Sequence, residues 1–271
     1  MDPDWYVTPG PMTGLGPDQL AVVRALDPDP LALCRVVQGL FTAPPDARGT
    51  GLSPERSTDR STRPATRLLE RVLGLDPSPL DTPRSTDRRV VGTCRHYAVL
   101  STALLRATGT PARARCGFAA YFDPPRKVDH WIVEHWDSED RRWVRTDAEV
   151  LDHDLPANPA DLGRDDFLTG GEAWQRVRSG DEDASLFGVH GTDHWGPAEI
   201  RGNVIRDLAA LQKVEVLPWD EWGPMQDSYE GRTDSAFDEL MDDAAAACAG
   251  EDDAELARVS ALLAVPDELV G

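Results

Sequence analysis

The stretch from Val90 to Asp147 changes its hydrophobic period once, and that change limits the folds open to the chain. From Cys94 to Thr108 apolar residues recur every three or four positions, and Gly109 followed by Pro111 ends the pattern. Three later runs are short and rich in β-forming residues: Ala112 to Phe122, His130 to Trp136 and Arg142 to Val150. We therefore expect an α+β fold in which one helix packs on an antiparallel sheet.

Cys94 falls in the first turn of the expected helix, directly after Gly92-Thr93. Unpaired backbone N–H groups and the positive end of the helix dipole favour a thiolate there, and they also suit an oxyanion. We expect the thiol to ionise easily and its own backbone N–H to serve as an oxyanion donor. The other cysteines lie in apolar or alanine-rich segments without C-x-x-C spacing, so we expect small buried side chains rather than a zinc site or disulfides: Cys34, Cys116 and Cys248.

The polar turn Asp137–Asp140, or the same length shifted by one, sets the register of the second and third strands. Cross-strand neighbours on one face have Cβ atoms about 4.5–5.5 Å apart. If Trp136 pairs with Arg141, His130 lies opposite Asp147, and we expect a direct hydrogen bond between them. Any even-length loop keeps both on one face. The same register sets two more pairs: Glu134 with Trp143, and Ile132 with Arg145.

The expected order is a cysteine at a helix start, a histidine on one strand and an aspartate on the next. This arrangement resembles the transglutaminase-like branch of the papain-like cysteine enzymes. The resemblance covers Arg88 to Leu151. By this resemblance Cys94 is the nucleophile, His130 the base and Asp147 the group that orients the imidazole. Asp152 and His153 would replace or reinforce Asp147 in another register. The likeness is carried by Gly92-Thr93-Cys94-Arg95-His96, Gly109-Thr110-Pro111-Ala112-Arg113, Asp129-His130-Trp131 and Trp143-Val144-Arg145-Thr146-Asp147.

Such a triad implies acyl transfer through a thioester on the cysteine. Three interpretations stay open: hydrolysis by a peptidase or amidase, amide formation by a biosynthetic acyltransferase, and a non-catalytic binding or scaffolding protein that retains the triad. The expected partners are a peptide or small-molecule acyl donor and, for the second interpretation, an amine acceptor.

Five residues are expected to contact the substrate: Thr93, Tyr97, Trp131, Trp195 and Trp219. The His190–Pro197 segment is aromatic and irregular, and we expect it to line the cleft. Its His190, Asp193 and His194 lack a clear further ligand, so we predict no metal there. No calcium-type loop occurs in the sequence, and we expect no cofactor.

The flanks are expected to add helices to a papain-like core. We divide the chain into an N-terminal helical layer and loop (1–87), the core (88–151), a helical and Trp-rich extension (152–233) and acidic C-terminal helices (234–271). The expected helices cover 17–26, 30–40, 64–73, 161–178, 199–211, 234–249 and 252–263, with a loop over 43–63 and a short strand over 214–217.

The net charge of −20 argues against nucleic acid and anionic membranes as partners. The sequence has no run of about 18 apolar residues and no basic, apolar leader, so we expect a cytoplasmic protein. Lys127 and Lys213 are its two lysines, whereas Arg, Ala, Asp and Pro are abundant, which is typical of a GC-rich bacterial genome.

Overall fold

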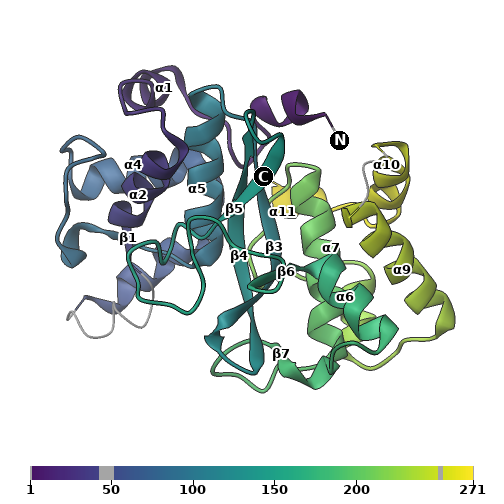
Figure 1. Ribbon diagram of the computed structural model, residues 1–271. Helices are drawn as coiled ribbons and strands as arrows, with labels where there is room; N and C mark the ends of the chain where they lie inside the picture. The colour runs from purple at the N-terminus through teal and green to yellow at the C-terminus, as the bar shows by residue number, and fades with distance from the viewer. Residues whose placement is uncertain (1, 43–51, 250–252, 271) are drawn as a thin grey trace.

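The computed structural model describes residues 2–42, 52–249 and 253–270. Its main sheet lies between two groups of helices (Figure 1). The strand order is β5-β4-β3-β6 with antiparallel pairing, and β7 pairs with β4 in parallel. The strands are β3 (Ala112–Asp123), β4 (Arg126–Asp137), β5 (Arg142–Thr146), β6 (Phe167–Thr169) and β7 (Phe187–Gly188). The predicted mixture of a central helix with an antiparallel sheet is confirmed.

The helix α5 (Cys94–Ala107) confirms the helix predicted from the apolar spacing. Thr93 is its N-cap, and the backbone N–H of Thr93 donates to Nδ1 of His96 at 3.0 Å, which satisfies one group at the helix start. The helix packs on β3 and β4, and α2 (Pro30–Leu40) and α4 (Ala65–Leu75) pack against it. This burial holds the first turn of α5 beside the sheet.

On the other side of the sheet lie α6 (Gly170–Ser179), α7 (Pro197–Leu211) and α9 (Ser235–Ala249) (Figure 1). β6 pairs with residues 117–119 of β3. Beyond that point Asp207 on α7 accepts a hydrogen bond from the backbone N–H of Cys116 at 3.1 Å. A helix side chain thus satisfies the strand edge that β6 leaves open.

β4 and β5 pair two residues away from the principal predicted register. Trp136 pairs with Trp143 and Glu134 with Arg145, so the predicted pairing of Trp136 with Arg141 is wrong, as are those of Glu134 with Trp143 and Ile132 with Arg145. The loop is the predicted one shifted by one residue, because Asp137 pairs with Arg142. A shift of two residues preserves which face each side chain occupies.

β5 ends at Thr146 rather than at Val150, so Asp147 lies in the turn that follows the strand and not on the strand itself. The predicted cross-strand pairing of His130 with Asp147 is therefore wrong. The backbone N–H of Asp147 instead bonds Pro159 O at 2.8 Å, which ties the turn to a distant loop.

A buried group of charges lies within the sheet around Glu134. Its carboxylate meets Arg113 at 2.6 Å, Arg115 at 3.1 Å and Arg145 at 3.1 Å, and Arg115 also meets Asp207 at 2.7 Å. Burial by itself raises the pKa of Glu134, but the three guanidinium groups outweigh it and hold that pKa well below its usual range. These ion pairs join β3, β4, β5 and α7.

Several flanking predictions need correction. Only the second part of the helix predicted over 161–178 is helical, because α6 begins after its N-cap Thr169. Phe167 lies in β6 instead, since the free edge of β3 offers backbone partners there. α4 continues past the predicted end at residue 73, so Gly74 lies inside the helix, where a glycine costs only about 1 kcal/mol. Residues 214–217, predicted as a strand, have irregular structure. Within the loop predicted over 43–63, Pro54–Ser61 forms a 3₁₀ helix (η2). Residues 43–51 of that loop lie outside the described residues.

Other helix predictions are confirmed within a few residues: α1 (Pro17–Val23), α2, α7, α9 and α10 (Asp253–Leu262). Short elements that the sequence did not predict are η1 (Pro3–Val7), η3 (Thr86–Arg88), η4 (Ala184–Leu186), α8 (Pro224–Tyr229), α11 (Asp267–Val270), and the parallel pair β1 (Phe41–Thr42) and β2 (Val90–Val91). Across the described part of the chain, none of the helices has both the length and the apolarity needed to cross a bilayer.

Candidate active site

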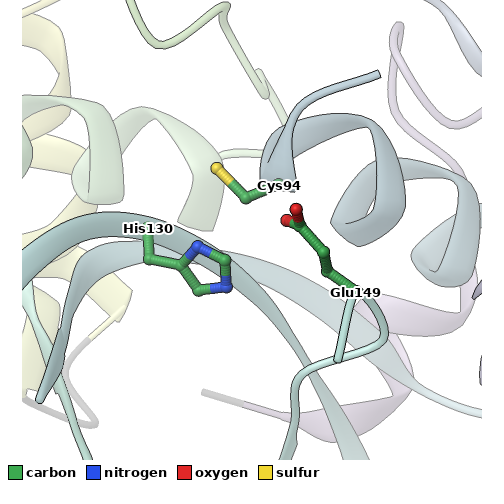
Figure 2. A group of neighbouring side chains, drawn as sticks. All are labelled: Cys94, His130 and Glu149. Carbon is green, nitrogen blue, oxygen red and sulfur yellow. The ribbon is translucent and has the colours of Figure 1, made fainter. Parts of the chain in front are cut away.

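Three elements bring a thiol, an imidazole and a carboxylate together. Cys94 comes from the first turn of α5, His130 from β4 and Asp147 from the turn after β5. The sulfur of Cys94 lies within 4.8 Å of a ring nitrogen of His130. Nε2 of His130 lies 2.8 Å from Oδ2 of Asp147, so the predicted hydrogen bond between these residues is confirmed. That bond engages Nε2 and leaves Nδ1 to face the cysteine (Figure 2).

The carboxylate of Asp147 is held from three directions. Besides His130, the hydroxyl of Tyr121 donates to Oδ2 at 2.6 Å, and the backbone N–H of Glu149 donates to Oδ1 at 3.0 Å. Asp147 is only 1% exposed, so these donors replace water around its charge. Tyr121 could not be predicted as part of the site, because its strand position alone does not reveal which carboxylate it reaches.

Burial raises the pKa of the Cys94 thiol, and the charge of Glu149 acts in the same direction, while His130 lowers it. The prediction that the helix start makes this thiol easy to ionise is therefore wrong for the residue in its folded surroundings. Burial lowers the pKa of His130, but the charges of Asp147 and Cys94 outweigh burial and raise it well above 6.5. Ionisation of the sulfur thus depends on the imidazolium beside it.

Glu149 is a second residue at the site that the sequence did not predict. One of its carboxylate oxygens, the sulfur of Cys94 and a ring nitrogen of His130 all lie within 4.8 Å of one another. Figure 2 shows the three side chains around a common space, reached from α5, from β4 and from the turn after β5. The sequence feature that could have indicated Glu149 is its position two residues after Asp147, whose side chain accepts a hydrogen bond from the Glu149 backbone N–H and closes the turn.

A pocket of about 280 Å³ adjoins Glu149. Tyr97 and Phe41 form part of its wall, and their rings pack with centroids 5.1 Å apart. Arg35, Arg89 and Asp152 are also on its lining, so the pocket presents both signs of charge. Polar side chains of this kind suit a polar or charged substrate group.

The other residues predicted to contact the substrate have different surroundings. Thr93 is half-buried beside Cys94. Trp131 is 1% exposed and packs in the core. Trp195 carries the guanidinium of Arg126 over its ring at 4.9 Å, and Trp219 is 47% exposed. None of these three tryptophans lines the pocket beside Glu149, and their contact with a substrate stays a prediction.

Residues 73–148 match the family model of the transglutaminase-like superfamily. The match contains Cys94, His130 and Asp147, and it stops one residue before Glu149. No curated protein and no solved structure matches the chain. The chain therefore contains a transglutaminase-like domain, a type associated with cysteine-dependent acyl-transfer or hydrolase activity.

Proposed function

We propose that this protein is a cytoplasmic, thiol-dependent hydrolase with a papain-like core, which cleaves an amide or ester through a thioester on Cys94. The observation that carries the proposal is the convergence of Cys94, His130 and Asp147 from three separate elements, inside the transglutaminase-like match. A thiol within reach of an imidazole that a carboxylate orients is the arrangement that cysteine nucleophiles require. It does not favour a binding protein that merely retains the triad.

In this mechanism Nδ1 of His130 accepts the thiol proton and the sulfur attacks the carbonyl carbon of the acyl donor. The tetrahedral oxyanion accepts a hydrogen bond from the backbone N–H of Cys94. His130 then gives the proton to the leaving amine, and the thioester forms. Water, deprotonated by His130, attacks that thioester and releases the acid. Asp147 keeps Nε2 of the imidazole protonated, so that Nδ1 is the nitrogen that faces the sulfur.

A second candidate, an amide-forming acyltransferase, is favoured by Glu149. Its carboxylate stands within 4.8 Å of the sulfur, where an acyl acceptor must approach. A negative charge at this place attracts an ammonium group more strongly than it attracts water. In that case a protonated amine would lose one proton to Glu149 and a second to His130 as its nitrogen replaces the sulfur on the acyl carbon.

Acylation with p-nitrophenyl acetate, followed by intact mass, tests the first step without knowledge of the natural donor. We expect a single acetyl adduct on the wild-type protein, its loss in Cys94→Ser, and much slower formation in His130→Ala. Cys248→Ser is the matched control, because that thiol is buried and should not react. An adduct that forms equally on Cys94→Ser would refute the proposal.

The fate of the acyl group separates the two candidates. After acetylation, the adduct is left in buffer alone or with a small primary amine at a pH where the amine is protonated. Rapid loss to acetate in buffer supports the hydrolase. Loss that needs the amine and gives the amide supports the acyltransferase.

A further inference from the structure

We propose that Cys94, His130 and Glu149 also form a binding site for Zn²⁺, and that the bound ion blocks the thiol. The inference goes beyond acyl transfer, because it assigns the same three side chains a ligand that would hold the protein inactive. Zinc binding itself does not require that the proposed reaction occurs.

The positions of the three donor atoms suit a zinc ion. A sulfur, a nitrogen and an oxygen lie within 4.8 Å of one another. Zinc binds such atoms at about 2.0–2.3 Å in a tetrahedron, which places neighbouring donors about 3.3–3.8 Å apart. The three side chains therefore need to approach by at most about 1.5 Å. Glu149 can supply part of that movement, because it is half-buried and stands on a turn rather than in the sheet.

His130 also has the orientation of a zinc ligand. A histidine that binds zinc through one nitrogen usually donates its other N–H to a carboxylate, which fixes the ring and makes the ligand more basic. His130 has this partner already, since Nε2 lies 2.8 Å from Asp147. Asp147 is itself fixed by the Tyr121 hydroxyl at 2.6 Å. The imidazole is thus oriented for a ligand on Nδ1 before any ion arrives.

The donor atoms and their charges also match zinc. Thiolate, imidazole and carboxylate together suit Zn²⁺ better than Mg²⁺ or Ca²⁺, which prefer oxygen ligands alone. The negative charges of the Cys94 thiolate and the Glu149 carboxylate balance the two positive charges of the ion. The protein carries a net charge of −20, which favours the approach of cations in general.

Three protein ligands leave one position of the tetrahedron open, as in catalytic zinc sites. Here, however, one ligand is the sulfur that would act as the nucleophile. A thiolate bound to zinc cannot attack a carbonyl while the ion stays, and the imidazole nitrogen that would accept its proton is occupied as well. The bound ion would therefore inhibit the reaction.

Glu149 distinguishes this site from a simple pair of a thiol and an imidazole. Glu149→Gln retains the size of the side chain, and its backbone N–H can still donate a hydrogen bond to Asp147. The substitution removes the charged oxygen ligand. We expect wild-type protein to bind one Zn²⁺, and Glu149→Gln to bind it at least about tenfold more weakly, in the range seen when a metal site loses a supporting group. Glu70→Gln, on the exposed surface of α4, is the matched control.

Cobalt replaces zinc as a visible probe in the test. Titration of untagged protein with Co²⁺ should produce a thiolate-to-cobalt absorption band that saturates at one equivalent, weakens in Glu149→Gln and disappears in Cys94→Ser. Zn²⁺ should displace the cobalt and slow alkylation of Cys94 by iodoacetamide, with less protection in Glu149→Gln than in Glu70→Gln. A band that persists in Cys94→Ser, or equal affinity in wild-type and Glu149→Gln proteins, would overturn the inference.

The cobalt titration and the acylation experiment fail separately. A protein that never forms the acetyl adduct but shows the Cys94-dependent cobalt band would contradict the proposed function and support the zinc site. A protein that forms the acetyl adduct but shows no cobalt band would support the proposed function and contradict the zinc site.

Discussion

Nε2 of His130 and Oδ2 of Asp147 lie 2.8 Å apart, although these residues are not cross-strand partners. His130 pairs with Gly117 on β3, and β5 ends one residue before Asp147. The carboxylate reaches the imidazole from a turn, where Tyr121 and the backbone N–H of Glu149 hold it. The contact therefore depends on the turn as well as on the sheet.

Asp147→Asn should shift ionisation of Cys94 to higher pH. The negative charge of Asp147 raises the pKa of His130, and the imidazolium in turn favours the thiolate. Without that charge His130 loses its proton at lower pH, so the thiolate loses its partner. We expect the pH profile of iodoacetamide labelling to move up by about one unit or more, which is about 1.4 kcal/mol. Tyr121→Phe retains the charge and should shift the profile less; coincident profiles for Asp147→Asn and wild type would contradict this account.

Glu134→Gln should lower the free energy of unfolding by about 3–5 kcal/mol, because it leaves three buried guanidinium groups without their shared carboxylate. Urea unfolding followed by circular dichroism measures the change. Glu70→Gln breaks an exposed pair with Arg67 and should cost less than about 1 kcal/mol. Similar losses in the two variants would mean that the buried group adds nothing special to stability.

Stability should decrease between pH 6.5 and pH 5 because of His96. Burial and the charge of Arg95 lower the pKa of His96 to about 3. Below pH 6.5 the unfolded chain gains a proton that the folded chain does not, so the free energy of unfolding falls by up to about 1.4 kcal/mol per pH unit. The expected loss from His96 is about 2 kcal/mol over this window. Urea unfolding at both pH values measures it.

The variant His96→Asn isolates this effect, since its amide oxygen can replace Nδ1 as acceptor for Thr93. Its stability should depend less on pH, by about the same 2 kcal/mol. His135, whose pKa burial also lowers, adds a loss of the same sign in both proteins. His130, whose pKa is raised, adds a small gain of the opposite sign as the unfolded chain takes up its proton, and this gain is the same in both proteins. Equal pH dependence in wild type and variant would rule out the assignment to His96.

Gly117→Ala should disturb both the fold and the site. A Cβ at Gly117 would lie 2.1 Å from Leu168 O and 2.7 Å from the Cα of Thr169, so β6 would have to move. We expect a loss of about 1–3 kcal/mol or more, as for overpacked cores, together with slower alkylation of Cys94, because Gly117 pairs with His130. Gly74→Ala meets nothing within 4 Å inside α4 and should stabilise the protein by up to about 1 kcal/mol. The prediction fails if Gly117→Ala is as stable as wild type.

The position of Cys94 at a helix start could be predicted from the sequence, because helix spacing, the glycine and proline stop and the Thr93 cap are properties of neighbouring residues. The shared face of His130 and the Asp147 region was also predictable, since side chains in a strand alternate with a period of two. The exact pairing was not, because loops of equal length shifted by one residue satisfy the same pattern.

Tertiary structure alone decided three features of the site. It placed Asp147 on a turn, it brought Glu149 beside the sulfur, and it raised the pKa of Cys94 where the helix start by itself favours a thiolate. Each of these depends on which distant segments surround a side chain and exclude water from it. Local sequence determines the conformation of a segment and the spacing of its side chains, whereas desolvation and contacts between segments arise only when the whole chain has packed.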